Sequence, residues 1–184
     1  MNVLLTTPRL ILRQFTRADL PAFTAYRRQP EVAQYQSWQA YSAADAEAFY
    51  AGQANLDFNV DDSWFQIAVV GQQSGLLLGD VAVHFFDEGK QAELGMTFDT
   101  GYQRQGFASE ALHAVIAMLF NQYNKHRLVA TLDTRNQRAA HLLEKLGFRR
   151  EAHFRQNIFF KGAWGDEYAY ALLNSEWQDK ADIR

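Results

Sequence analysis

Two stretches of the chain carry apolar side chains at the three- and four-residue spacing of a helix with one buried face. The longer stretch follows Gly106 and places on one side Ala108, Ala111, Leu112, Val115, Ile116, Leu119 and Phe120. The second stripe is followed by Gly147, where a helix C-cap favours glycine, and consists of Ala139, Leu142, Leu143 and Leu146. The pattern therefore predicts two amphipathic helices in the second half of the chain.

Two shorter helices are predicted before residue 55. Asp19 can cap the first, with Pro21 in its first turn. Ser42 and Asp45 have the spacing of a capping box before the second. The acidic residues 55–62 follow and are predicted to form a loop.

Alternating or continuous runs of β-forming residues predict seven strands, at residues 9–15, 64–70, 76–86, 92–98, 127–133, 148–160 and 167–173. Glycine-containing turns separate the three middle strands, which indicates an antiparallel meander. From residue 92 on, the order strand, helix, strand, helix, strand calls for right-handed crossovers on a mixed sheet. The predicted fold is α/β, with a mixed, mostly antiparallel sheet and flanking helices.

Length and composition predict one compact domain spanning residues 1–184. At about 150 residues per domain the chain is too short for two full domains, and hydrophobic residues make up 48% of it, enough for a sizeable core. No run of about 18 apolar residues is present, and the N-terminus lacks the features of a signal peptide. We therefore expect a soluble, cytoplasmic protein without a membrane partner.

Composition also excludes several kinds of chemistry. The chain contains no Cys, which removes disulfides and thiolate nucleophiles, and none of its five His has a zinc-type spacing. The net charge of −3 argues against a broad nucleic-acid surface. Residues 1–90 carry six basic and ten acidic side chains, whereas residues 93–160 carry nine basic and six acidic ones. An anionic ligand is therefore expected to bind the second half.

Residues 98–110 run from a predicted strand through a short polar loop into the start of the longest helix. The first N–H groups of a helix have no partner within it, and the helix dipole makes that end positive. Gly106 and Ala108 are small enough for a phosphate to approach the main chain, and Arg104 adds a charge. The segment has neither the P-loop sequence nor the dinucleotide fingerprint. Taken alone, it fits either a phosphate site or an ordinary helix entry.

Several motifs resemble one family. The six residues Gln103-Arg104-Gln105-Gly106-Phe107-Ala108 resemble the Q/R-x-x-G-x-G/A signature with which the GNAT superfamily of N-acetyltransferases binds the pyrophosphate of acetyl-CoA. Residues 7–13 are similar to the opening strand of its RimJ/RimL-type branch. Further similar segments are residues 92–96 (fourth strand), 106–112 (third helix), Asn136 with 143–148 (the Asn-then-E-K-L-G-F element) and 162–166 (last hairpin). The resemblance covers nearly the whole chain.

The resemblance implies that two neighbouring parallel strands, ending near Phe98 and Asp133, splay apart and hold the pantetheine of acetyl-CoA between them. Gly95 would mark the bulge that opens this gap. The residues implied to contact the co-substrate acetyl-CoA are Met96, Thr97, Phe98, Gln103, Arg104, Gln105, Gly106, Phe107, Ala108, Ser109 and Asn136.

The implied reaction is transfer of an acetyl group to a primary amine by direct attack in a ternary complex. Glu93 is the matching candidate base, acting directly or through water, and a backbone N–H near Thr97 or Phe98 would polarise the thioester carbonyl. The places where many members carry a Tyr or Ser as general acid hold Leu143 and Ala139. Neither side chain can donate a proton, so the thiolate leaves unprotonated or is served by water.

The acceptor amine is not identified by the sequence: a protein N-terminus, such as that of a ribosomal protein, and a small-molecule amine both remain. Four aromatic residues fit either the core or the acceptor cleft: Trp38, Tyr41, Trp64 and His84. A cationic acceptor would be attracted by Asp57, Asp61 and Asp62. The alternative functions are a non-catalytic acyl-CoA-binding module and, disfavoured by the phosphate-type loop, a structural interaction domain.

Overall fold

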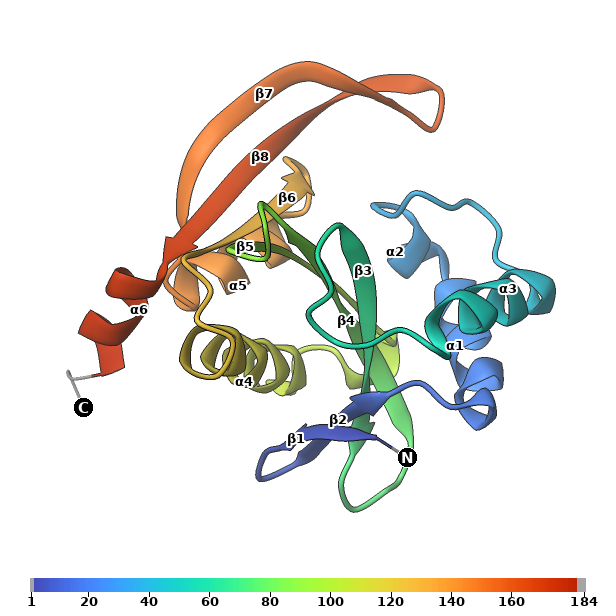
Figure 1. Cartoon of the computed structure of the whole chain (residues 1–184). Coiled ribbons are helices and arrows are strands. Elements are labelled where there is room, and N and C mark those ends of the chain that lie inside the picture. Colours follow the sequence, from blue (N-terminus) through green and yellow to red (C-terminus); the bar gives the residue numbers. More distant parts are fainter. Residues whose placement is uncertain (1, 182–184) are drawn as a thin grey trace.

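The computed structural model describes residues 2–181, with side chains described up to residue 177. Its eight described strands form one sheet in the order β1-β2-β3-β4-β5-β6-β8-β7 (Figure 1). They are β1 (Val3–Thr6), β2 (Leu10–Gln14), β3 (Ser63–Gly71), β4 (Leu77–Phe86), β5 (Gln91–Phe98), β6 (Arg127–Asp133), β7 (Arg149–Phe160) and β8 (Ala163–Leu173). Among the described strands, only β5 and β6 pair in parallel. The mixed, mostly antiparallel sheet is therefore confirmed.

Helices cover both faces of the sheet. Side chains of β3 alternate, so that Ile67 and Val69 join one apolar cluster while Ala68 and Val70 join the other. The larger cluster is covered by α4 (Phe107–Asn121) and α5 (Gln137–Lys145), and the smaller one by α1 (Leu20–Arg27), α2 (Pro30–Ala33) and α3 (Ala43–Gln53). The described residues also form two short 3₁₀ segments, Arg17–Asp19 and Thr100–Tyr102, and the helix α6 (Asn174–Ala181). No described helix is both long and apolar enough to span a membrane.

The predicted helix boundaries at Ser42 and Gly147 are confirmed. The Ser42 hydroxyl accepts a hydrogen bond from the Asp45 N–H at 3.1 Å, which closes the capping box. Gly147 has φ +98° and donates to the Glu144 carbonyl, while the Phe148 N–H donates to the Leu143 carbonyl. This pair of bonds is a Schellman motif, in which glycine relieves the strain of the left-handed conformation.

The sequence patterns did not predict β1, α2 and α6, and they placed the start of β8 four residues too late, at residue 167 instead of Ala163. Asp19 is at the N-cap position of α1, but its side chain points backward instead of capping that helix. Its carboxylate accepts the Thr16 N–H at 2.7 Å and pairs with both terminal nitrogens of Arg13, each at 2.7 Å. A buried ion pair between β2 and the start of α1 therefore replaces the predicted cap.

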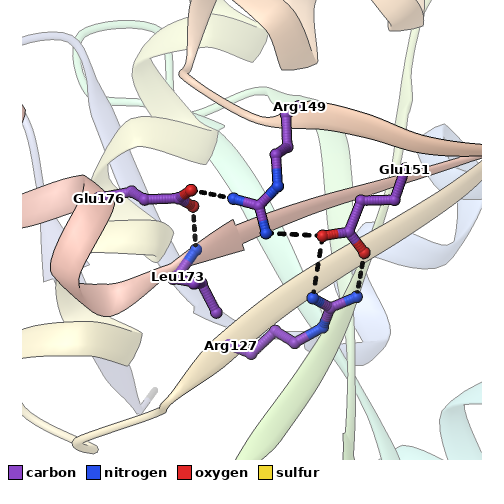
Figure 2. Close-up of polar contacts among 5 residues, drawn as sticks. All are labelled: Arg127, Arg149, Glu151, Leu173 and Glu176. Atoms are coloured by element: carbon purple, nitrogen blue, oxygen red, sulfur yellow. Dashed lines mark hydrogen bonds and ion pairs between the residues drawn. The ribbon is translucent and has the colours of Figure 1, made fainter.

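A charged network fixes the base of the long β7–β8 hairpin (Figure 2). Arg127 of β6 reaches across β8 to the Glu151 carboxylate on β7 at 2.5 Å, and Arg149 binds the same carboxylate at 2.6 Å. Arg149 also pairs with Glu176 of α6, whose carboxylate accepts the Leu173 N–H at 2.8 Å. The network therefore connects the hairpin and α6 to β6, one of the two parallel strands.

Substituting Asp19→Asn should lower the free energy of unfolding by about 3 kcal/mol, because it leaves Arg13 buried without its counter-charge. Glu47→Gln breaks the exposed pair with Arg17 and should change it by less than about 0.5 kcal/mol. Chemical denaturation of both variants measures the difference. Equal effects of the two substitutions would show that the Arg13–Asp19 pair is not a structural requirement.

The same pair predicts an acid-labile component of stability. Burial raises the pKa of Asp19, but the hydrogen bonds from Arg13 and Thr16 outweigh it, and the net pKa is lowered. The stabilisation is therefore complete above the ordinary carboxyl pKa of about 4 and is lost as the pH falls through the lowered value. In the Asp19→Asn variant, the free energy of unfolding should therefore fall less as the pH is lowered below about 4.

Candidate functional site

The parallel strands β5 and β6 pair over only three positions. Their register runs from Gln91 opposite Arg127 to Glu93 opposite Val129, after which the strands part although β5 continues to Phe98. The predicted splay is therefore present. The predicted bulge at Gly95 is wrong, because β5 stays in unbroken register with β4 and Gly95 lies opposite Ala82. The gap opens because pairing with β6 stops, while the β4 side of the strand remains regular.

A cavity of about 480 Å³ lies beside the free end of β5. It is bounded by Met96, Thr97 and Phe98 of the strand, by the loop into α4, by the first turns of α5 and by residues 31–36 around the end of α2. The predicted co-substrate residues that line it are Met96, Thr97, Phe98, Gln103, Arg104, Gly106, Ala108, Ser109 and Asn136. Nine residues from three separate elements are thus brought to one cavity.

The loop into α4 presents its main chain to this cavity. Gly106 is the N-cap of α4 with φ +83°, a conformation that glycine adopts without strain. The first hydrogen bond inside the helix runs from the Glu110 N–H to the Gly106 carbonyl. The N–H groups of Phe107, Ala108 and Ser109 therefore have no acceptor within the helix. Arg104, exposed and on the cavity wall, adds a positive charge. The donors, the helix dipole and Arg104 together suit a diphosphate.

Two glutamine side chains of the loop are occupied within the loop. The Gln103 amide donates to the Phe98 carbonyl at 2.9 Å, and the Gln105 amide donates to the Gly101 carbonyl at 2.8 Å. Phe107 points away from the cavity and packs under the Arg9 guanidinium, 4.4 Å from the ring centre. Neither Gln105 nor Phe107 lines the cavity, so any contact of these residues with a ligand there would come from main-chain atoms of the loop.

The start of α5 forms the opposite wall. The Asn136 side-chain oxygen accepts the Ala139 N–H at 3.3 Å and caps the helix, which leaves its amide N–H groups for a ligand. Ala139 lines the cavity, whereas Leu143 is buried in the main core. Neither position provides an acid, as the sequence predicted.

Glu93 lies on the sheet face opposite α4. Its neighbours Ala92 and Leu94 belong to the α4-side core, so the half-buried Glu93 side chain points the other way. In the antiparallel register Glu93 is opposite His84, and His84 is opposite Trp64. The Trp64 and His84 rings stack with centroids 4.8 Å apart, and Trp64 is 46% exposed. Glu93, His84 and Trp64 thus form a row across three strands.

Trp38 and Tyr41 lie outside the cavity lining and pack around a buried arginine. The Trp38 indole N–H donates to the Arg27 carbonyl at 2.9 Å, and the Arg27 guanidinium lies 4.2 Å from the Trp38 ring and 5.2 Å from the Tyr41 ring. Arg27 in turn pairs with the fully buried Asp80 at 3.5 Å. Both aromatic side chains are therefore used to enclose this charge, and their predicted role in a substrate cleft gains no support.

Several cavity residues were missed by sequence reasoning. The segment from Glu31 to Gln36 forms one rim, where the Tyr35 hydroxyl donates to the Arg135 carbonyl at 3.4 Å across the opening. Arg138, His141 and Leu142 complete the α5 wall. The only signal for the rim was Pro30 at the first position of a helix four residues long, too short to show a periodic pattern.

These features match a known family. The Acetyltransferase (GNAT) domain model matches residues 9–149, and the chain belongs to this family of acetyltransferases. It is 31% identical to the uncharacterized N-acetyltransferase YnaD of Bacillus subtilis, over 94% of this chain and 98% of that protein. An acetyltransferase (GNAT family) structure from Bacillus anthracis is 27% identical, with a TM-score of 0.85 over 95% of this chain and 99% of that one.

A further structure has the same fold at lower identity. Spermidine N-acetyltransferase from Vibrio cholerae, solved in complex with CoA and spermine, is 22% identical and has a TM-score of 0.80 over 94% of this chain and 99% of that one. The protein is thus an acetyltransferase, and acetyl-CoA is its acyl donor.

Replacing Gly106 by Glu should abolish CoA binding, because a carboxylate would enter the turn and repel phosphate, and because φ +83° strains any side chain. Gly106→Ala keeps the strain without the charge and should weaken binding by a smaller factor. Isothermal titration with CoA measures both variants.

The matched control for strain is Gly75→Glu. Gly75 has φ +67° in the β3–β4 turn, and an added Cβ there would meet no atom within 4 Å. This variant should lose stability yet bind CoA like the unmodified protein. If folded Gly106→Glu also bound CoA normally, the loop would not be the anion site.

Proposed function

We propose that residues 1–184 act as one domain that transfers an acetyl group from acetyl-CoA to a primary amine, either a protein N-terminus or a small-molecule amine, in a ternary complex. The observation that carries the proposal is the end of β5–β6 pairing at Glu93. The Glu93 carboxylate therefore lies on one face of the sheet, at the point where β5 and β6 begin to diverge. The cavity and the phosphate-type loop lie further along β5. The resemblance of residues 7–13 favours the RimJ/RimL-type branch.

In this proposal the pyrophosphate of acetyl-CoA accepts hydrogen bonds from the main chain between Gln105 and Ser109, with Arg104 adding charge. The pantetheine lies along Met96, Thr97 and Phe98, whose β6 side has no strand partner. The Asn136 amide completes the contacts. When bound, acetyl-CoA supplies an acetyl group activated as a thioester.

The chain's own residues prepare the amine. An ammonium group cannot attack a carbonyl, so Glu93 accepts its proton directly or through water. A backbone N–H of Thr97 or Phe98 donates to the carbonyl oxygen as negative charge develops there. Ala139 and Leu143 supply no proton. As the C–N bond forms and the C–S bond breaks, the second proton of the attacking nitrogen passes to water, and the thiolate leaves as the anion or receives a proton through that water.

The acceptor side of the sheet suits a positively charged amine. Trp64 and His84 present stacked aromatic rings beside Glu93, and aromatic faces attract cations. Asp62 is exposed and its carboxylate lies 3.8 Å from the His84 ring. Asp61, in contrast, accepts the Gly89 N–H at 2.8 Å and belongs to the loop's own structure. Asp57 is exposed like Asp62, and we assign these two acidic residues to attracting the acceptor.

The central experiment measures CoA release from acetyl-CoA with a panel of amines: peptides with free N-termini, polyamines and lysine analogues. Turnover with at least one amine is expected. Binding of acetyl-CoA without turnover on any member would contradict the proposed amine acceptors and favour a binding module.

Substituting Glu93→Gln should have an effect that depends on the acceptor. A lysine-like amine of pKa about 10.4 is neutral in only about 1 part in 10³ at pH 7, against about 1 in 10 for an α-amine. We expect kcat/KM to fall by about 10²-fold or more for the former and clearly less for the latter. Glu88→Gln, in the exposed β4–β5 turn, is the control. Near-normal rates on both amines would remove Glu93 from the mechanism.

Electrostatic steering predicts that kcat/KM for a cationic acceptor falls with rising salt, as the Debye length shrinks from about 30 to about 8 Å. Asp57→Asn combined with Asp62→Asn should flatten this dependence without changing CoA affinity, whereas Glu47→Gln, on α3, should not. A double variant with the original salt slope would show that the loop does not select the acceptor.

A further inference from the structure

A carboxylate lies in the first turn of α4, next to the loop that we assign to the pyrophosphate. Glu110 shares with Gly106 and Ser109 a second hollow of about 500 Å³ on the outer side of the helix. Acidic residues at a helix start are favourable because they face the positive end of the dipole. The same charge would repel a second anion at that end, so a site for diphosphate needs Glu110 to be neutralised.

The β1–β2 connection supplies this neutralisation. The Arg9 Nε donates to one Glu110 oxygen at 2.6 Å, and the Arg9 main-chain N–H donates to the other at 3.0 Å. The Thr7 hydroxyl donates to that second oxygen at 2.6 Å. Partial burial raises the pKa of Glu110, but the bonds from Thr7 and Arg9 outweigh it, and the net pKa is lowered. Glu110 is therefore a carboxylate, and Arg9 is its counter-charge.

Arg9 also holds the loop itself. A terminal nitrogen of its guanidinium donates to the Gln105 carbonyl at 2.9 Å, and the guanidinium carbon lies 4.4 Å from the centre of the Phe107 ring. The other terminal nitrogen is 3.2 Å from where a Cβ on Gly106 would stand. In a trans peptide the carbonyl and the following N–H point in opposite directions. By fixing the Gln105 carbonyl toward itself, Arg9 turns the Gly106 N–H away.

We propose that Arg9 is a positioning residue for acetyl-CoA: it cancels the charge of Glu110 and fixes the Gln105–Gly106 peptide, so that the start of α4 accepts a diphosphate. The inference rests on the proposed pyrophosphate site but not on the identity of the acceptor amine. It assigns a function to the arginine of the β1–β2 connection, about 100 residues away in sequence from the loop that it orders.

The test is a double-mutant cycle of Arg9 and Glu110, in which the Kd for CoA is measured by titration in the absence of an acceptor amine. Arg9→Gln should raise the Kd for CoA about tenfold at low salt, because it leaves the Glu110 charge uncompensated. Arg9→Lys keeps the charge and should stay within about threefold of the unmodified protein. Glu110→Gln added to Arg9→Gln should restore most of the lost affinity, since it removes the repulsive charge.

A purely structural role predicts a different result. If Arg9 only stabilised the fold, the second substitution would remove further hydrogen bonds and weaken CoA binding again. In steady-state assays Arg9→Gln should raise KM for acetyl-CoA and leave kcat and the acceptor KM unchanged. The matched control is Arg17→Gln, alone and with Glu47→Gln, which breaks an exposed ion pair away from the loop and should not change the Kd.

The outcomes separate this inference from the function on which it rests. If unmodified protein binds CoA but Gly106→Glu does too, the proposed pyrophosphate site is wrong. If Gly106→Glu abolishes binding while Arg9→Gln binds normally, or the double variant binds no better than Arg9→Gln, the positioning role of Arg9 is refuted.

Discussion

The structure depends on one parallel strand pair in an otherwise antiparallel sheet. Antiparallel neighbours can be joined by tight turns, but a parallel pair needs a crossover that returns the chain to the same edge. Here α4 is that crossover, and a loop of residues 99–106 joins it to the end of β5. The positive end of a 15-residue helix therefore lies beside the free end of the strand. Because β5 and β6 stop pairing at Glu93, a cavity remains beside the N-terminus of this helix.

Regular elements were predicted from the sequence because their patterns are long enough to be seen. The stripe from Ala108 to Phe120 and the meander from Trp64 to Phe98 carry two or more periods each, and both are confirmed. The strand β1 and the helix α2 have four residues each and no detectable period. Asp19 occupied the position of a cap, but the sequence does not reveal that Arg13 lies within reach on the neighbouring strand.

Sequence patterns pointed to residues that the structure brings to the cavity where the relevant features are local in sequence. The segment from Gln103 to Ser109 contains its own glycine, its own charge and a helix start, so it could be recognised without tertiary structure. Trp38 was indistinguishable by sequence from a cleft residue, since only the fold reveals the buried Arg27 that it covers. Tyr35 was missed for the converse reason, because its place at the cavity rim depends on how α2 meets α5. For Trp38 and Tyr35, contacts between elements far apart in the sequence determine the role of the side chain.

A binding loop made of main-chain donors, as we propose for residues 105–109, has a consequence for how the sequence can drift. Every residue type except proline carries the same N–H group, so most replacements at Gln105, Phe107 or Ser109 would leave the donors in place. The requirement then falls on the backbone conformation at Gly106, on the length of the loop and on the charge of Arg104, while the side chains of Gln105, Phe107 and Ser109 can change. Two proteins that share less than a third of their residues, such as this chain and YnaD, can therefore diverge over most of their length without changing the geometry of such a loop.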